Sequence, residues 1–364
     1  MYKNCFANKK ILITGHTGFK GSWLSVWLLK LGADIIGISK DIPTNPSMFE
    51  VLNLEREINH NICDITNLKS TKNIIEKENP DLIIHLAAQP IVSTSFKDPI
   101  NTITTNVIGT ANILEILREY PKKIGCVFIT SDKAYDNIEQ VWGYKENDKM
   151  GGKDIYSGSK GSAELIIKSY QSSFLMKKDN IKIGIGRAGN VIGGGDWAQD
   201  RIVVDCMKAW SMGNRVEIRS PNATRPWQHV LEPLSGYLSL AENICNDRLD
   251  GEGFNFGPNA DQNASVKKLI KDLSQYWNFK HTEDSYDVIS DDKFNECSLL
   301  KLNCDKALYY LKWSATLKYD ETIKFTSQWY YEYFNKINNL YSFTINQINE
   351  YEKLAKERKL QWSE

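Results

Sequence analysis

The chain has 364 residues and carries 45 basic and 45 acidic side chains, so its formal net charge is zero. This length suffices for two domains or one large α/β unit with a sizeable core, and the balanced charge argues against nucleic-acid binding. We expect a cytoplasmic protein without membrane segments, because the first residues lack a signal-peptide pattern and no apolar run reaches membrane-spanning length.

The first predicted elements are an apolar strand over 10–14, a glycine-rich turn and an amphipathic helix over 22–31. Glycines permit a tight turn and close backbone approach, and a helix N-terminus offers unpaired N–H groups to a pyrophosphate. A glycine-rich turn alone is often only a turn, but the order strand, turn, helix favours nucleotide binding. The predicted cofactor-binding residues of this turn are Gly15, Thr17, Gly18, Phe19, Lys20 and Gly21.

The ends of the next two predicted strands bear on the choice of cofactor. The strand over 33–38 leads into Lys40 and Asp41. A carboxylate here usually holds the ribose of NAD, whereas a cation suits the 2′-phosphate of NADP. Asp41 favours NAD, and Lys40 leaves NADP open. After the third strand, Asp64 is expected to meet the adenine or to cap the helix that starts near Asn67.

The fourth predicted strand, within residues 80–89, runs into small residues that let a cofactor lie close to the sheet. His85 lies inside the apolar run and is interpreted as a core histidine. A helical pattern over 98–118 turns Asn106 toward the sheet. The cofactor lining predicted from these segments is Ile65, Leu86, Ala87, Ala88 and Asn106.

The fifth strand, 126–131, and the following helix carry the candidate catalytic residues. Tyr156 and Lys160 are spaced i, i+4, which places them on one helix face. A nearby cation lowers the pKa of a phenol, and the resulting phenolate accepts a proton from a hydroxyl whose carbon gives up a hydride. This spacing is common by chance, so its weight comes from the nucleotide-binding turn and from Ser131, Asp132 and Lys133 at the strand end.

The remaining pattern completes an α/β fold, predicted as a Rossmann-type doubly wound parallel sheet with a smaller interleaved α/β substrate domain. The helix after Tyr156 continues to about 174; strands follow at 181–186 and 253–257, and helices at 229–246, 265–273, 322–334 and 346–360. We assign residues 1–188 and 230–258 to the dinucleotide-binding domain, and 189–229 and 259–364 to the substrate domain with the C-terminal helices.

Cysteines and arginines add two expectations. The seven cysteines are odd in number and form no Cys-x-x-Cys pair, so we expect reduced packing residues and no metal site; they are Cys5, Cys63, Cys126, Cys206, Cys245, Cys297 and Cys304.

Guanidinium groups bind two phosphate oxygens at once, which makes Arg201, Arg219 and Arg225 candidates for a substrate pyrophosphate. Surface arginines are usually only solvated, so only Arg225, inside the motif 223–230, clearly exceeds that expectation. His229 is expected to bond locally.

Several motifs resemble the extended short-chain dehydrogenase/reductase family, in its nucleotide-sugar-modifying branch. They are Thr14-Gly15-x-x-Gly18-Phe19-x-Gly21, Leu86-Ala87-Ala88, Asn106-Val-x-Gly109-Thr110 and Tyr156-x-x-x-Lys160. Longer stretches resemble the CDP-glucose 4,6-dehydratases of that branch, namely 15–24, 43–50, 130–133, 189–198 and 223–230. The likeness extends to 343–351 and so covers nearly the whole chain.

The resemblance implies a closed redox cycle in which bound NAD⁺ takes the C4 hydride of the sugar, water leaves across C5 and C6, and the hydride returns to C6. It implies Tyr156 as the base, Lys160 as its partner and ligand of the nicotinamide ribose, and Ser131 as a hydrogen-bond partner of the C4 oxygen. Asp132 matches the acid for the departing C6 hydroxyl. The dTDP-glucose enzymes have glutamate next as the C5 base; here Lys133 leaves that role open between a neutral amine and an electrostatic one.

The resemblance also implies CDP-glucose as substrate, contacted by Gln89, Ser131 and Asn190, and a place in the deoxysugar biosynthesis that supplies lipopolysaccharide or capsule. It implies a homodimer or homotetramer packed through the helices near 100–118 and 157–174. The alternatives are a dehydratase or C4 epimerase for another nucleotide sugar, or a non-catalytic protein that kept the fold. An epimerase expels no water and needs no Asp132, and intact Tyr156 and Lys160 argue against the non-catalytic alternative.

Overall fold

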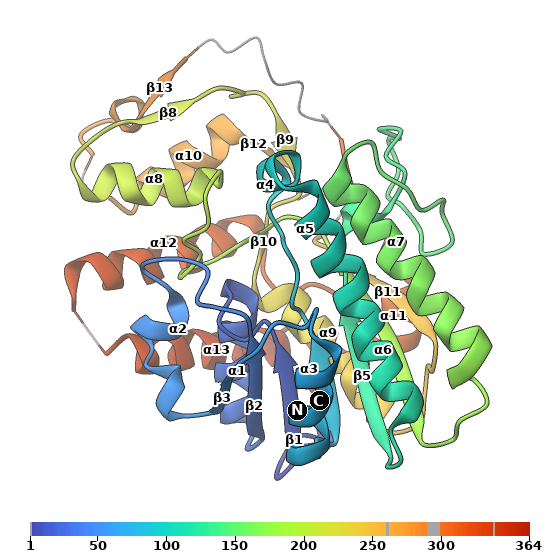
Figure 1. The fold of residues 1–364 in the computed structure, drawn as a ribbon. Helices are drawn as coiled ribbons and strands as arrows, with labels where there is room; N and C mark the ends of the chain where they lie inside the picture. Colours follow the sequence, from blue (N-terminus) through green and yellow to red (C-terminus); the bar gives the residue numbers. More distant parts are fainter. Residues whose placement is uncertain (1, 260–261, 278, 290–298, 338) are drawn as a thin grey trace.

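The computed structural model describes residues 2–259, 262–277, 279–289, 299–337 and 339–364. Its centre is a seven-stranded sheet in the order β11-β6-β5-β4-β1-β2-β3, with all neighbouring strands parallel (Figure 1). This order is that of a doubly wound Rossmann sheet with one added edge strand, which confirms the predicted fold class. The strands are β1 (Lys10–Thr14), β2 (Asp34–Ser39), β3 (Asn59–Ile62), β4 (Leu82–His85), β5 (Ile124–Ile129), β6 (Ile181–Ala188) and β11 (Glu252–Phe256).

The sheet is buried on both faces, as the continuous apolar runs of its strands require. Leu12 and Ile83 face one hydrophobic cluster, whereas Ile11 and Ile13 face the other, because successive side chains of a strand alternate. Helices α3 (Leu68–Glu78), α6 (Gly109–Glu119) and α7 (Ile155–Tyr170) cover the first face. Helices α1 (Phe19–Lys30) and α9 (Leu231–Cys245) cover the second.

Helix α1 begins three residues earlier than the sequence pattern suggested. Gly21 therefore lies in its first turn, where an added Cβ would stand 2.2 Å from the carbonyl oxygen of Gly15. The predicted helix over 98–118 consists of α5 (Pro99–Ile103), a π-helical turn (Thr104–Ile108) and α6. A second π-helical turn, Gln171–Leu175, extends α7 to the predicted end.

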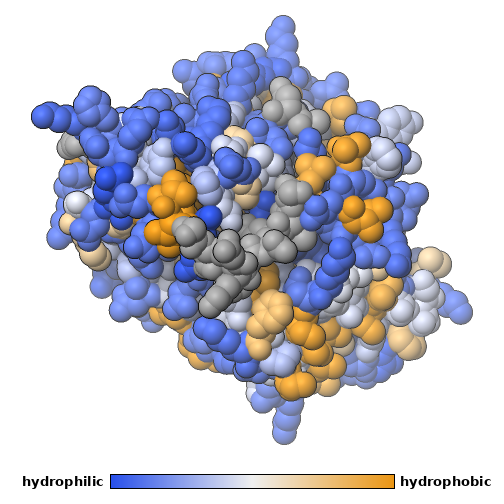
Figure 2. Space-filling view, turned by 90° about the horizontal axis from the view of Figure 1, so that it is seen from above, coloured by the Kyte–Doolittle hydropathy of each residue, from blue (hydrophilic) through white to orange (hydrophobic). Residues whose placement is uncertain are grey.

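A smaller lobe lies above the carboxyl ends of the strands in Figure 1. The lobe pairs β8 with β13 in parallel and β9 with β12 in antiparallel orientation. Seen from above, the molecule is mainly hydrophilic, with apolar side chains along its lower rim and in smaller groups at the left and right (Figure 2). The elements of the lobe are α8 (Ile202–Ser211), β8 (Val216–Ile218), β9 (Thr224–Arg225), β12 (Ala264–Ser265), α10 (Val266–Ser274) and β13 (Tyr286–Val288).

The C-terminal helices α12 (Tyr319–Asn335) and α13 (Leu340–Glu357) do not all belong to this lobe. Helix α13 packs on α1, where Trp27 Nε1 donates to Glu352 at 2.8 Å and the Trp27 ring meets Tyr351 at 5.6 Å. The assignment of the segment 259–364 to the substrate domain did not include this contact and stays a prediction. The physical reason for the contact is that the middle of α1 is buried all round, and such a helix needs cover on every side.

Shorter elements complete the described part of the chain. They are α2 (Met48–Val51), α4 (Val92–Lys97), β7 (Val191–Ile192), β10 (Gln228–His229) and α11 (Asp305–Leu311), with 3-10 turns at Tyr2–Asn4, Leu54–Arg56, Asp132–Ala134, Thr282–Ser285 and Gln361–Ser363. Among the residues described, none of the helices combines the length and the apolar character that a bilayer crossing requires.

Candidate active site

The predicted catalytic residues meet at the carboxyl end of β5. Ser131 and Asp132 follow this strand directly, and α7, capped by the Asp154 side chain, places Tyr156 in its first turn and Lys160 one turn later. The exposed fractions of Ser131, Asp132, Tyr156 and Lys160 are 9, 6, 8 and 7%. The Ser131 side chain and the charge of Asp132 both change the pKa of the Tyr156 phenol, so both lie close to it. The structure therefore brings these residues into one buried site, as predicted.

The glycine-rich turn has the shape of a phosphate cradle. Gly15 has a φ of +77°, and an added Cβ would lie 2.8 Å from the backbone nitrogen of Ala87. Gly18 caps α1 without a side-chain hydrogen bond to the first turn, so the helix N–H groups stay available for an anion. Thr17 is buried and donates its hydroxyl to the Asp41 carbonyl at 2.7 Å, which fixes the end of β2 beside the turn. These features fit a dinucleotide.

Acidic residues flank this cradle at the ends of β2 and β3. Asp41 is exposed, whereas Asp64 Oδ1 accepts a hydrogen bond from the Thr66 backbone at 2.9 Å. Burial raises the pKa of Asp64, but the Thr66 hydrogen bonds and Lys40, 3.7 Å away, outweigh burial and lower it. Helix α3 is capped by Asn67 and not by Asp64, so the capping alternative for Asp64 was wrong.

Burial dominates the electrostatics of the catalytic pair. It raises the pKa of Tyr156 to about 12, while the Ser131 side chain lowers it in part and the Asp132 charge adds to the rise. Burial also lowers the pKa of Lys160 to about 8, against the opposing effect of Glu164. The net direction is opposite to the lowered pKa expected from the sequence, because desolvation of the phenolate outweighs the groups that lower this pKa, the Ser131 side chain and the Arg201 charge.

Asp132 has the environment of a proton donor. Burial raises the pKa of its carboxyl, and Lys133, the Ser131 hydroxyl at 2.9 Å and Lys20 reverse only part of this rise. A carboxyl that keeps its proton more readily is suited to protonate a leaving hydroxyl. Lys133 is partly buried beside Asp132.

Lys20 has a contact in this site that sequence reasoning did not include, and Tyr237 escaped it altogether. The ammonium of Lys20, assigned above to the cofactor, lies 6.0 Å from the ring centre of Tyr237, and it acts on Asp132 across the site. Burial is the main cause that lowers the pKa of Lys20 to about 8. The charges of Arg201 and Lys160 lower this pKa further, whereas the charge of Asp132 raises it. Tyr237 is fully buried, and its hydroxyl has no hydrogen-bond partner among the described residues. No local pattern on α9 marks Tyr237 as part of the site.

The side chains of the predicted ligands Gln89 and Asn106 form hydrogen bonds between the loop after β4 and the neighbouring helices. Gln89 donates through Nε2 to Thr102 Oγ1 at 2.8 Å and accepts at Oε1 from the Ile91 backbone at 2.6 Å. Asn106 accepts from the Gln89 backbone at 2.8 Å and donates to Ser159 on α7 at 2.9 Å. Their amides thus brace the loop after β4 against α7, a role that their assignment as substrate and cofactor ligands did not include.

The core assignment of His85 is confirmed, while the cofactor contacts of its neighbours stay predictions. His85 is a core histidine: its ring nitrogens lie 2.8 Å from Thr14 Oγ1 and 3.2 Å from Thr110 Oγ1, and burial lowers its pKa to about 3. Leu86, Ala87 and Ala88 are partly buried at the end of β4, and Ile65 is buried against Gly109.

The lobe contributes the predicted substrate residues. Asn190 is partly buried just after β6. Arg201 Nε lies 3.4 Å from Asp196 Oδ2, and the charge of Arg201 lowers the pKa of Tyr156, which places this arginine near the catalytic pair. Arg219 is exposed just after β8, and Arg225 is partly buried on β9. His229 bonds locally as expected, accepting the Leu231 N–H at Nδ1 over 3.3 Å.

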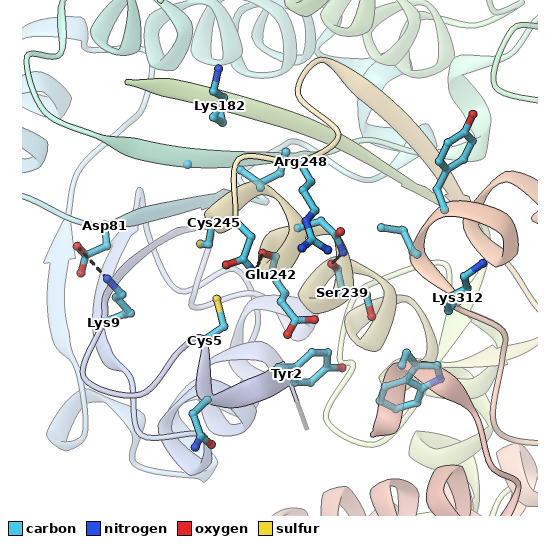
Figure 3. A pocket seen from close by; sticks show the side chains of 18 of the residues that line it. Tyr2, Cys5, Lys9, Asp81, Lys182, Ser239, Glu242, Cys245, Arg248 and Lys312 are labelled. Carbon is cyan, nitrogen blue, oxygen red and sulfur yellow. Dashed lines mark hydrogen bonds and ion pairs between the residues drawn. The ribbon is translucent and has the colours of Figure 1, made fainter. Parts of the chain in front are cut away.

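A cavity of about 820 Å³ lies away from this site, at the amino ends of the strands (Figure 3). Its lining includes Cys5 and Cys245, whose thiols interact, and neither takes part in the site above. All six cysteines that the structure describes are free, while Cys297 lies outside the described residues. In the same described ranges no group of His, Cys, Asp and Glu has the arrangement of a metal site.

Comparisons with known proteins agree with this geometry. The family model described as GDP-mannose 4,6 dehydratase matches residues 12–326. A curated CDP-glucose 4,6-dehydratase of Salmonella typhimurium is 41% identical over 333 residues, covering 90% of this chain and 92% of the relative. The dTDP-glucose 4,6-dehydratase of Haemophilus influenzae is 26% identical, covering 88% and 97%.

Solved structures share the fold at lower identity. The UDP-glucose 4-epimerase of Thermotoga maritima has a TM-score of 0.76 at 23% identity, covering 89% of this chain and 99% of that one. The dTDP-glucose 4,6-dehydratase of Bacillus anthracis, solved in complex with NAD, has a TM-score of 0.74 at 21% identity, covering 89% and 97%. With the family model and the 41% relative, these results show that the chain belongs to the GDP-mannose 4,6-dehydratase family, within the extended short-chain dehydrogenases/reductases.

Proposed function

We propose that this protein is an NAD-dependent CDP-glucose 4,6-dehydratase, which converts CDP-glucose to CDP-4-keto-6-deoxyglucose. The observation that carries the proposal is the buried carboxyl of Asp132, with a raised pKa, beside the Tyr156–Lys160 pair. An oxidation site alone serves many sugars, but an acid beside it serves the expulsion of water. The choice of CDP-glucose follows the 41% identical relative.

The side chains divide the reaction among them. When bound, NAD supplies the hydride acceptor for C4 and the donor for C6. Gly15, Gly18 and the N-terminus of α1 would hold its pyrophosphate. The exposed carboxylate of Asp41 suits a ribose hydroxyl. Lys40, the cation that the 2′-phosphate of NADP would need, is paired with Asp64 instead, which supports NAD.

In this proposal Tyr156 takes the proton of the C4 hydroxyl, Ser131 orients that oxygen, and the Lys160 ammonium stabilises the phenolate. Asp132 gives its proton to the departing C6 hydroxyl. Lys133 is the neighbouring amine on the same 3-10 turn, placed to remove the C5 proton or to stabilise the charge that develops there. Arg201, near Tyr156, is the arginine we assign to the substrate's pyrophosphate. It replaces Arg225 on β9, which the sequence favoured, and ranks ahead of Arg219 just after β8.

We also propose a homodimer, or a tetramer built from it. Helices α5, α6 and α7 lie side by side on one flank of the sheet (Figure 1). This flank, with the adjoining α4 and the π-helical turn after α7, carries large apolar side chains in contact with solvent. Among them are Phe96, Ile100, Leu165 and Phe174, which are 70, 71, 54 and 46% exposed. Exposed apolar patches of this kind mark protein interfaces. Sedimentation equilibrium of the wild type and of Ile100→Lys tests the assignment.

Incubation with single sugar nucleotides tests the proposed activity. The purified protein, supplied with NAD⁺, is incubated separately with CDP-glucose, dTDP-glucose, GDP-mannose and UDP-glucose, and each product is weighed by mass spectrometry. We expect loss of one water from CDP-glucose alone. An unchanged mass with an altered sugar configuration would replace the proposal by the epimerase alternative, and water loss from another nucleotide sugar would replace the substrate.

A further inference from the structure

A buried ion pair lies directly behind the candidate active site. Arg187, near the end of β6, donates through Nε and Nη2 to the two carboxylate oxygens of Glu164 on α7, at 2.6 and 2.5 Å. The two side chains are 1 and 0% exposed. A bidentate pair of this kind fixes direction as well as charge, whereas burial of two charges is by itself weak support for stability. The other contacts of the pair indicate what it positions.

Both ends of the catalytic segment are attached to this ion pair. The Thr130 hydroxyl donates to Glu164 Oε1 at 2.6 Å, and Arg187 Nη1 donates to the phenol oxygen of Tyr135 at 2.6 Å. Thr130 and Tyr135 stand immediately before and after residues 131–134, which include Ser131 and Asp132. The ion pair is therefore hydrogen-bonded to the residues on both sides of the segment 131–134.

The same pair is fixed to the catalytic helix and to the sheet. Glu164 follows Lys160 by one turn of α7 and Tyr156 by two, so all three share a helix face. The Tyr135 phenol donates onward to Asn255 Oδ1 on the edge strand β11 at 2.8 Å. The Arg187 guanidinium also lies 5.2 Å from the centre of the Tyr135 ring, which limits rotation of both groups.

We propose that Glu164 and Arg187 are positioning residues for the dehydration. Their ion pair holds the segment 130–135 against α7, and so sets the placement of Ser131 and Asp132 relative to Tyr156 and Lys160. Neither residue needs to touch the substrate. The kinetic part of this inference rests on the proposed function; its structural part does not.

We call the Glu164–Arg187 ion pair, with its hydrogen bonds to Thr130 and Tyr135, the clamp. Two conservative variants test it without disturbing its charges. Thr130→Val and Tyr135→Phe each remove one hydroxyl from the ion pair and leave Glu164 and Arg187 paired. Because a displacement of about 1 Å at reacting groups costs about 10²-fold in rate, we expect kcat for CDP-glucose to fall about 10- to 100-fold in each variant, with KM changed less than about twofold. Hydrogen exchange, followed by mass spectrometry, should speed up in the peptide covering 130–136.

Matched controls separate positioning from ordinary destabilisation. Thr344→Val on α13 and Tyr120→Phe after α6 remove buried hydroxyls of the same kind far from the site, where Thr344 bonds Leu340 at 2.8 Å and Tyr120 bonds Asn79 at 2.9 Å. We expect both to keep wild-type kcat and wild-type exchange in 130–136. Glu164→Gln is unsuitable as the sole test, since it leaves the Arg187 charge buried without its partner, and such chains often fail to fold.

The outcomes are distinct. If Thr130→Val and Tyr135→Phe match the controls in kcat and in exchange, the positioning role is refuted. A lower melting temperature with unchanged kcat per folded molecule would likewise reduce the pair to a structural one. If the wild type converts no CDP-glucose, the proposed function fails, and the exchange comparison alone then decides whether the clamp exists.

Discussion

Replacement of Lys160 by methionine is expected to stabilise the protein while abolishing its activity. Lys160 is 7% exposed, and burial lowers the pKa of its ammonium from 10.5 to about 8. Below about pH 8 both the native and the unfolded chain carry this proton. The native state then bears the desolvation cost in full, about 3 kcal/mol at about 1.4 kcal/mol for each tenfold change in the proton equilibrium. A methionine of similar length carries no such cost.

The sign of the pH dependence follows from proton binding. Between about pH 8 and pH 10.5 the unfolded chain binds more protons than the native one at Lys160, so this residue makes the free energy of unfolding rise with pH. At about pH 9.5 the remaining cost is about 1.4 kcal/mol. Between about pH 7 and pH 9.5 the wild type should therefore gain about 2 kcal/mol relative to Lys160→Met, whatever the packing effect of the methionine.

Urea unfolding of nucleotide-free protein at these two pH values measures the difference. Lys353→Met, which removes a lysine that is 75% exposed, is the control and should follow the wild type. Parallel pH dependence of the wild type and Lys160→Met would show that Lys160 keeps its ordinary proton affinity in the native state. The argument from burial would then be refuted, even if turnover of the variant were lost.

Three further substitutions address the chemistry of the site. Tyr156→Phe should lower turnover by about 10²- to 10⁴-fold, the range lost with a general base, while isothermal titration shows unchanged NAD binding; wild-type turnover would remove the base assignment. Asp132→Asn should leave C4 oxidation intact and slow water loss by a similar factor, so that rapid-quench mass spectrometry detects the oxidised sugar before dehydration; normal dehydration would exclude Asp132 as the acid. Gly21→Ala should abolish NAD binding, because its Cβ would stand 2.2 Å from the Gly15 carbonyl oxygen; titration with wild-type affinity would contradict the cradle.

Local patterns carried the prediction of the sheet and of the main catalytic residues. Apolar runs buried on both faces identify parallel strands, and the turn from Gly15 to Gly21 depends on residues that are close in sequence. Tyr156 and Lys160 share a helix face, so their spacing alone placed them together. The same is true of Ser131 and Asp132, which directly follow a strand.

Contacts between distant segments could not be predicted in this way. The ion pair of Glu164 and Arg187 joins α7 to β6, and neither residue belongs to a motif that reports its partner. Tyr237 reaches the site from α9 only through the packing of that helix under the sheet. The raised pKa of Tyr156 has the same origin, because its largest cause is burial, which the sequence does not display.

The contact of α1 with α13 has a consequence for synthesis of the chain. Helix α1 ends at Lys30, whereas the residues of α13 that cover its Trp27, Tyr351 and Glu352, are made more than 300 residues later. During synthesis the apolar flank of α1 therefore stays exposed until α13 has emerged from the ribosome. Contacts between residues so distant in sequence form slowly, and apolar surface prone to aggregation stays exposed until they form. Chains that stop before α13 are thus expected to be substrates for chaperones and proteases even though they contain every proposed catalytic residue.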